Sequence, residues 1–230
     1  MLKLIRLEWK KHTLWKYVRN ACIATIALLG LLMLISSDAG TGKIVAQTGK
    51  SEIHSLTEMF LNMAYLVFTG AMLSTFVVSE YENKLIHLMF SYPIKRSKIM
   101  VAKILAVCIF NFATLVASKL LVYGILVTTR SAKTLGIYMG DLSFWTGTLL
   151  GAIFSICSGC IPLLVGMKMK SSKATLIASF IIMLAVLGVT QGNILPYNSF
   201  AGMMCYASQI LLAVIAVILA TYSIETEDIN

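Results

Sequence analysis

The sequence is poor in charged residues and in proline. Asp, Glu, Lys and Arg together make up 13% of its 230 residues, and only 3 residues are proline. A soluble globular protein usually carries charge on roughly a quarter of its residues, because its surface must meet water. The shortage of charge excludes an ordinary soluble domain. It predicts that many of the hydrophobic residues, which make up 58% of the chain, face lipid.

Residue types that catalyse reactions or bind metals are also few. The three histidines all fall in expected loops or helix flanks, and neither HExxH nor GxSxG occurs. The run GTGK at residues 40–43 is followed by Ile44, where a phosphate-binding loop needs serine or threonine. The CxxC of Cys157 and Cys160 lies in an apolar run without a second pair, which favours packing over metal or redox use. We expect no catalytic residue, metal site or cofactor on this chain.

Six apolar blocks, each close to the length that crosses a bilayer, occupy most of the chain. Before them, residues 1–20 place Leu2, Ile5 and Trp9 at helical spacing among basic residues, which predicts an amphipathic elbow helix on the membrane surface. We therefore predict an all-α integral membrane protein with six transmembrane helices in one domain, residues 21–230. The predicted spans are residues 21–36, 56–79, 99–128, 144–167, 174–190 and 204–222.

The placement of the basic residues predicts the orientation of these spans. Fourteen of the 19 Lys and Arg residues lie in residues 1–20, 80–103 and 168–173, on one side of the predicted membrane. Cytoplasmic flanks retain positive charge during insertion, so both termini are expected in the cytosol. The net charge of +9 then follows from membrane topology and requires no nucleic acid partner.

Lys119 is the one charge that the pattern places well inside an apolar block. A charge in hydrocarbon costs roughly 2.5 kcal/mol or more, and such residues often mark a transport pathway. The third block is longer than a bilayer requires, however, so Lys119 can also lie near its outer end and extend to the lipid headgroups. Both interpretations stay open, and Asn111 and Lys119 are the two candidate pathway residues.

Small residues recur every four positions in the fourth block, at Gly147, Gly151, Ser155 and Gly159. This spacing leaves one helix face nearly bare and predicts close packing against another helix. The partner helix can belong to the same subunit or to a second one. Pro162 is expected to kink the helix just beyond this face.

A segment of mixed charged and apolar residues, 80–98, separates the second and third spans. Its apolar residues Leu85, Leu88, Met89 and Phe90 are expected outside the membrane, where something must cover them. They can lie on the bilayer surface, or they can dock on a partner protein.

This segment resembles the corresponding region in permease subunits of ATP-binding-cassette transporters of the type 2 exporter class. In that family the second span typically ends in E-x-E-x-G-T-x-x-x-L, followed by P-I/V-x-R and a later lysine. Lys84 and Leu85 stand where the family commonly has Gly-Thr. The positions that match are Glu80, Glu82 and Asn83, Met89 at the apolar position, Pro93, Ile94 and Arg96 of the proline motif, and Lys103.

The resemblance implies a membrane subunit that does not itself catalyse a reaction. ATP and Mg²⁺ would bind a separate ATPase subunit that docks on residues 83–92, and a second permease subunit, identical or different, would complete the complex. The sequence FSYPIKR is similar to that of permeases for the export of, or immunity to, antimicrobial peptides such as bacitracin and lantibiotics, which implies a bacterial cytoplasmic membrane. The implied ATPase-coupling residues are Glu80, Glu82, Asn83, Lys84, Leu85, Leu88, Met89, Phe90, Pro93 and Arg96.

Two other function classes are compatible with the sequence. One is a membrane-bound immunity or sensor protein that transports nothing. The other is a stand-alone channel or secondary transporter, which usually needs polar groups at the bilayer midplane. Asn111, Lys119 and Gln191 are few and scattered for that purpose. Dependence on ATP hydrolysis by a partner separates the exporter from both.

Overall fold

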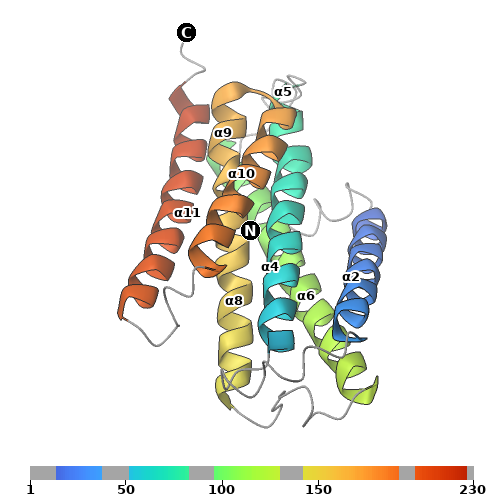
Figure 1. Cartoon of the computed structure of the whole chain (residues 1–230). Helices are drawn as coiled ribbons and strands as arrows, with labels where there is room; N and C mark the ends of the chain where they lie inside the picture. Colours follow the sequence, from blue (N-terminus) through green and yellow to red (C-terminus); the bar gives the residue numbers. More distant parts are fainter. Residues whose placement is uncertain (1–13, 38–51, 83–95, 130–141, 192–199, 227–230) are drawn as a thin grey trace. The chain divides into compact units, whose positions relative to one another are not determined.

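The computed structural model describes residues 14–37, 52–82, 96–129, 142–191 and 200–226. All of these residues are helical except Ile161, Lys170 and Ser171, so the prediction of an all-α protein is confirmed for the described part of the chain. Its elements, shown in Figure 1, are α2 (Leu14–Ser37), α4 (Glu52–Leu73), η2 (Ser74–Val78), α5 (Ser79–Glu82), α6 (Arg96–Thr129), α8 (Leu142–Cys160), α9 (Pro162–Met169), α10 (Ser172–Gln191) and α11 (Phe200–Thr226).

Four described stretches are long and apolar enough to cross a membrane: Trp15–Leu34, His54–Val78, Lys98–Thr128 and Phe144–Met169. Two further apolar helical stretches, Ser172–Leu187 and Tyr206–Thr221, are shorter. A helix needs about 20 apolar residues to span the hydrocarbon, because each residue adds 1.5 Å. These lengths identify a multi-pass membrane protein.

The first long helix begins earlier than the sequence predicted. We placed the boundary between the surface helix and the first span near Ala21, but α2 begins at Leu14 and continues without a break to Ser37. Its candidate span starts at Trp15, so the last residues assigned to the elbow belong to this helix. The remainder of the predicted elbow, residues 1–13, lies outside the described residues.

The chain forms two compact units. The described part of unit 1 comprises residues 65–82, 96–111, 154–191 and 200–226, together with Leu14. The described part of unit 2 comprises residues 15–37, 52–64, 112–129 and 142–153. Within unit 2, α2 contacts α6 through the hydroxyl groups of Thr25 and Ser118, whose oxygens lie 2.8 Å apart in a buried position.

In unit 1, α4 passes into the short π-helix η2 before α5 begins. A π-helix spaces its hydrogen bonds by five residues, which widens the turn, and such segments are frequent at functional sites. Ser74, the first residue of η2, donates from its hydroxyl to the carbonyl oxygen of Ser172 at 2.8 Å. The first residue of α10 is thereby attached to η2.

The connection from α8 to α10 contains two local irregularities. Helix α8 ends at Cys160 and α9 begins at Pro162, so the helix is interrupted at the proline where we expected a kink. Further along, Lys170 adopts a left-handed backbone conformation with φ 48°, which reverses the chain into α10. Gly166 faces α10 there, and a Cβ on it would overlap the side chain of Thr175. Only glycine allows this close approach.

Candidate functional site

Glu80, near the end of the continuous run formed by α4, η2 and α5, binds α6. Its Oε2 accepts a hydrogen bond from Nζ of Lys103. Both side chains are buried, with exposed fractions of 11% for Glu80 and 5% for Lys103. A buried charge is costly unless it is paired, so this ion pair fixes the end of α5 against α6. The resemblance singled out both residues, and the structure brings them together.

Glu82, two residues further on, binds the beginning of α10. Its Oε2 accepts hydrogen bonds from the Ser172 hydroxyl at 2.7 Å and from the Ser172 backbone N–H at 3.1 Å. The first amides of a helix lack intrahelical acceptors, and the helix dipole favours a carboxylate at this end. The Ser172 hydroxyl above all, and then its amide, hold the pKa of the exposed Glu82 below its ordinary value. We call Ser74, Glu80, Glu82, Lys103 and Ser172 the α5 junction.

Replacing Glu82 by alanine is expected to speed hydrogen exchange at the first amides of α10 without a measurable change in the melting temperature. The side chain is exposed, and exposed charges contribute little to global stability. Folding lowers the pKa of Glu82, so the contribution is complete above about pH 4.5 and is lost as the pH falls through the lowered value.

Hydrogen–deuterium exchange followed by mass spectrometry measures this local effect, and Lys168→Ala, at an exposed position of α9, is the control. Wild-type protein brought below the lowered pKa should exchange like Glu82→Ala, after correction for the intrinsic rate. Equal protection of α10 in Glu82→Ala and the wild type at neutral pH would contradict the role of Glu82.

The structure defines the helices on either side of the predicted coupling segment. The predicted coupling segment covers residues 80–98, and within it the structure describes α5 up to Glu82 and α6 from Arg96. The predicted coupling residues Asn83, Lys84, Leu85, Leu88, Met89, Phe90 and Pro93 lie outside the described residues.

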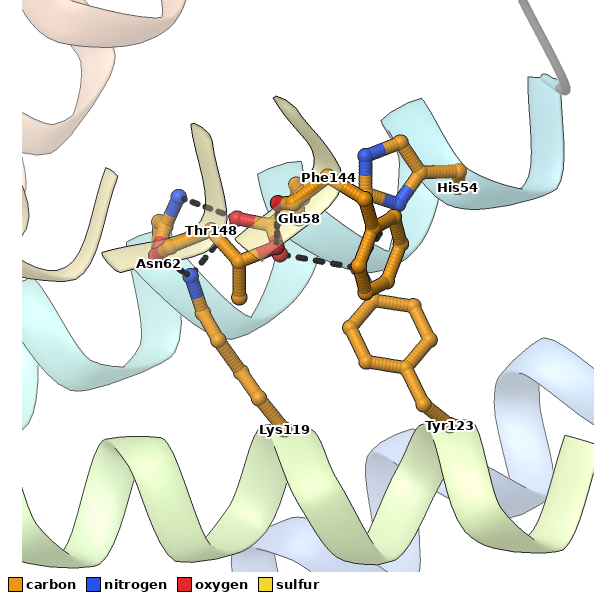
Figure 2. A network of polar contacts seen from close by, with 7 residues as sticks. All are labelled: His54, Glu58, Asn62, Lys119, Tyr123, Phe144 and Thr148. Atoms are coloured by element: carbon orange, nitrogen blue, oxygen red, sulfur yellow. Dashed lines mark hydrogen bonds and ion pairs between the residues drawn. The ribbon is translucent and has the colours of Figure 1, made fainter. Parts of the chain in front are cut away.

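A second group of polar residues lies in unit 2, between apolar stretches of α4, α6 and α8, and Figure 2 shows Glu58 among them. Oε2 of Glu58 accepts hydrogen bonds from Nζ of Lys119 at 2.6 Å and from Nδ2 of Asn62 at 3.3 Å. Oε1 accepts from the Tyr123 hydroxyl at 2.8 Å. Nζ of Lys119 also donates to the carbonyl oxygen of Thr148 at 3.0 Å. Glu58 therefore connects α4 to α6, and Lys119 connects α6 to α8.

His54 and two aromatic rings adjoin the carboxylate. Nδ1 of His54 lies 2.9 Å from the Tyr123 hydroxyl oxygen. The centroid of the Phe144 ring is 4.9 Å from that of His54 and 5.1 Å from that of Tyr123. Such apolar surroundings lower the local dielectric constant and strengthen each hydrogen bond. We call His54, Glu58, Asn62, Lys119, Tyr123, Phe144 and Thr148 the Glu58 cluster.

The structure contradicts the interpretation that Lys119 extends to the lipid headgroups. Its side chain is 1% exposed and its ammonium group is paired with Glu58. The physical reason is that a carboxylate within reach stabilises the ammonium more than a long extension to the membrane surface would. Asn111, the other candidate pathway residue, is also fully buried on α6 and belongs to unit 1.

Sequence reasoning missed His54, Glu58, Tyr123 and Thr148, because it assigned His54 to a helix flank or loop and Glu58 to the edge of a span. A usable signal was present in their spacing. His54, Glu58 and Asn62 recur every four residues, as do Lys119 and Tyr123, so each set lies along one helix face. Polar stripes on apolar helices generally face each other rather than lipid.

The residues of the predicted small-residue face have different surroundings. A Cβ on Gly159 would lie 2.7 Å from Cβ of Thr69 on α4, whereas a Cβ on Gly147 would meet nothing within 4 Å. Gly151 and Ser155 are buried. Gly159 thus lies where α8 and α4 approach closely in unit 1, as its small size permits.

Cys160 of the CxxC takes part in helix packing in unit 1. The sulfur atom of Cys160 on α8 lies 3.5 Å from that of Cys108 on α6, and neither forms a disulfide. Among the described residues, no group of three His, Cys, Asp or Glu side chains is arranged to hold a metal ion.

A model of the family described as ABC-2 family transporter protein matches residues 47–224, which is most of the chain. The chain belongs to this family. It is also similar to a protein of Bacillus subtilis strain 168 named uncharacterized protein YcbO, with 28% identity over 206 residues, covering 83% of this chain and 86% of the relative. No solved structure matches the chain with significance.

Family membership makes the chain a membrane permease component of an ABC-2 transporter, which confirms the resemblance drawn from residues 80–103. The matched region contains every residue of the α5 junction and of the Glu58 cluster. Both groups therefore belong to the part of the chain that defines the family, and YcbO aligns over a comparable length.

Proposed function

We propose that this chain is the permease subunit of an ABC exporter whose ATP is hydrolysed by a separate subunit. Membership of the ABC-2 transporter family supports this proposal. The sequence also lacks a phosphate-binding loop, which suits a chain that depends on a partner for ATP hydrolysis. In this proposal ATP and Mg²⁺ bind the partner, and two permease subunits, identical or different, accompany two ATPase subunits.

The proposed topology has six spans, with an N-terminal elbow and both termini in the cytosol of a bacterium. Four long apolar stretches and two shorter ones support this number of spans. The excess of Lys and Arg in residues 1–20, 80–103 and 168–173 supports a cytoplasmic location for those segments. In this orientation the α5 junction lies toward the cytosol and the Glu58 cluster toward the outer face.

The observation that carries the proposal is the pair of attachments at the α5 junction. Glu80 binds Lys103 of α6, and Glu82 binds Ser172 of α10, directly before the segment on which the ATPase is proposed to dock. A displacement of that segment by the ATPase would therefore move two further helices together with α5. Ion pairs and hydrogen bonds between rigid helices can transmit such a movement.

We propose an antimicrobial or other amphipathic peptide as the substrate. This proposal is supported by the sequence FSYPIKR at residues 90–96, which resembles the corresponding sequence in permeases of peptide exporters. The small-residue face and the candidate pathway residues Asn111 and Lys119 are proposed to shape the route. The described helices expose many apolar side chains, which suits a substrate that partitions into the bilayer.

Replacing Phe90 or Met89 by aspartate is expected to abolish association with the ATPase while membrane insertion stays normal. An apolar groove on the partner would have to bury the new carboxylate without a counter-charge, which is strongly unfavourable. Pull-down of the tagged chain from membranes in mild detergent measures association. Pro93→Ala is the matched control, because it introduces no charge into the proposed docking segment and should retain most of the ATPase. Full recovery of the ATPase with Phe90→Asp and Met89→Asp would contradict the docking role.

A further inference from the structure

Three exposed lysines gather at the turn that joins α9 to α10 in unit 1 (Figure 1). Lys168 lies in the last turn of α9, Lys170 is the residue at which the chain reverses, and Lys173 lies in the first turn of α10. We call these three lysines the basic turn. Residues 154–191, which contain it, include no Asp or Glu. Glu82 of α5 is attracted to Lys173, so three Lys against one Glu leave a net charge of +2.

The backbone of the basic turn is fixed by its own hydrogen bonds. The N–H of Lys170 donates to the carbonyl oxygens of Gly166 and Met167, and the N–H of Ser171 donates to that of Gly166 at 3.2 Å. Among the described residues, Lys170 is the one non-glycine residue with a positive φ, 48°. Glycine is the usual residue at such a helix end, because it has no Cβ. A lysine there is less favourable for the backbone but adds a charge at the turn, which points to a binding role.

An exposed apolar stripe continues from the basic turn along α10. Ile177, Ile181 and Leu184 follow Lys173 at intervals of four, four and three residues, so they lie on the same helix face as that lysine. The three apolar side chains, which we call the α10 stripe, are 61%, 62% and 61% exposed. From Lys173 to Leu184 the helix rises about 16 Å, at 1.5 Å per residue, which is close to half of the roughly 30 Å hydrocarbon thickness. The stripe is therefore as long as the acyl chains of one leaflet.

We propose that the basic turn and the α10 stripe form a binding site for one anionic phospholipid. Its phosphate lies among the three ammonium groups, which attract the negative charge and donate hydrogen bonds to the phosphate oxygens. Its acyl chains lie along the α10 stripe. Met169, between two of the lysines, is 64% exposed and adds apolar contact at the boundary between headgroup and chains.

The combination of charge and apolar stripe identifies a lipid as the occupant. A free phosphate ion matches the charge of the basic turn but makes no use of the α10 stripe. A soluble acidic protein reaches the turn, whereas the stripe belongs to the apolar helical stretch Ser172–Leu187, which lies at hydrocarbon depth. A phospholipid with a negative headgroup matches both parts at once.

The leaflet that supplies the lipid rests on the proposed function, because the proposed topology places the basic turn at the cytosolic side, where anionic lipids are concentrated. The site itself involves only this chain. Its test therefore uses the purified full-length chain without an ATPase. Absence of an ATPase partner would overturn the proposed function and leave the lipid site standing, and failure of the lipid site would leave the exporter proposal standing.

The experiment titrates the chain in neutral detergent with dioleoyl phosphatidylglycerol or with dioleoyl phosphatidylcholine, and native mass spectrometry counts the bound lipids. We expect the wild type to bind the anionic lipid more tightly than phosphatidylcholine, which has no net charge. The double variant Lys168→Gln/Lys170→Gln should weaken binding of phosphatidylglycerol about 25-fold at low ionic strength, at about fivefold for each lysine near the membrane surface. Its binding of phosphatidylcholine should not change. Lys173 is left in place because it also neighbours Glu82.

The matched control is Lys16→Gln/Arg19→Gln, which removes the same charge from exposed positions of α2 in unit 2 and should leave the affinity for phosphatidylglycerol unchanged. Equal affinities in the two double variants would overturn the site, as would a wild type that binds both lipids equally.

A competition arm separates the lipid from a free anion. Glycerophosphoglycerol, the same headgroup without acyl chains, should not displace phosphatidylglycerol when the two are present at equal concentration. Displacement by glycerophosphoglycerol or by inorganic phosphate under those conditions would overturn the lipid as occupant in favour of a soluble anion. A loss of the ATPase in pull-downs of Lys168→Gln/Lys170→Gln, with lipid binding intact, would overturn it in favour of a protein partner.

Discussion

Replacing Lys119 by methionine is expected to lower the free energy of unfolding by about 3–5 kcal/mol, because Glu58 loses its counter-charge. In the wild-type protein Nζ of Lys119 lies 2.6 Å from Oε2 of Glu58, and the two side chains are 1% and 17% exposed. Methionine retains most of the length of the lysine stem but none of its charge. For a chain of this size, the melting temperature in detergent should fall by on the order of 10 °C.

Two further variants separate the ion pair from general packing. The double variant Lys119→Met/Glu58→Gln should recover most of the lost stability, because removal of both charges leaves no buried charge unpaired. Leu120→Met lies on the exposed side of α6, with the leucine 48% exposed, and should stay within about 0.5 kcal/mol of the wild type. Equal melting temperatures for Lys119→Met and Leu120→Met would contradict a stabilising ion pair.

Replacing Gly159 by alanine is expected to destabilise unit 1 by about 1–3 kcal/mol, as overpacking of a close helix contact does. The added Cβ would lie 2.7 Å from Cβ of Thr69 and 3.1 Å from the carbonyl oxygen of Leu66. Thr69 is fully buried, and its Cβ is bonded directly to the α4 backbone. Rotation of the threonine side chain therefore gives no relief, and α8 must move away from α4.

Gly147→Ala is the matched control on the same helix. A Cβ at Gly147 meets nothing within 4 Å, and alanine favours a helix over glycine by about 1 kcal/mol. We therefore expect unchanged or slightly higher stability for Gly147→Ala, measured by thermal unfolding in the same detergent as Gly159→Ala. Adding Thr69→Gly to Gly159→Ala removes the threonine side chain that the new Cβ would meet. This double variant should therefore recover part of the lost stability. Similar melting temperatures for the two single alanine variants would show that Gly159 is not at a close contact.

The helices were predictable because each apolar block is long and the polar stretches between blocks are distinct. Residues 99–128 were predicted as one span, and the structure has the single helix α6 from Arg96 to Thr129. Pro162 predicted the interruption between α8 and α9, because a proline removes a backbone donor wherever it occurs. The first span was predicted to start near Ala21, whereas α2 begins at Leu14. Basic residues in the first turns of a helix do not mark in the sequence where that helix begins.

The Glu58 cluster was only partly predictable from the sequence. Lys119 was recognisable as a charge inside an apolar block, but its partner Glu58 is 61 positions away and near the beginning of its own helix. Pairing across that separation depends on how α4 and α6 are rotated in unit 2, which residue spacing does not determine. Likewise, a four-residue repeat marked Gly147 and Gly159 equally, although they have different neighbours.

The α5 junction shows what a family resemblance adds to such reasoning. The motif identified Glu80, Glu82 and Lys103 as residues of one region, while the structure assigned Lys103 to Glu80 and Ser172 to Glu82. Ser172 carried no signal in the sequence, because serine at a helix start is common. Its role follows from the close approach of α10 to the end of α5 in unit 1.

The most direct test of the proposed exporter is a pull-down of the tagged chain from its native membrane in mild detergent. Mass spectrometry would identify the co-purifying proteins, and the same sample would be assayed for ATP hydrolysis. We predict recovery of a nucleotide-binding ATPase in near-equal amount with this chain. The recovered complex should hydrolyse ATP, and the chain purified alone should not. Repeated absence of any ATPase, under detergent conditions that keep a known ABC transporter intact, would contradict the proposed exporter.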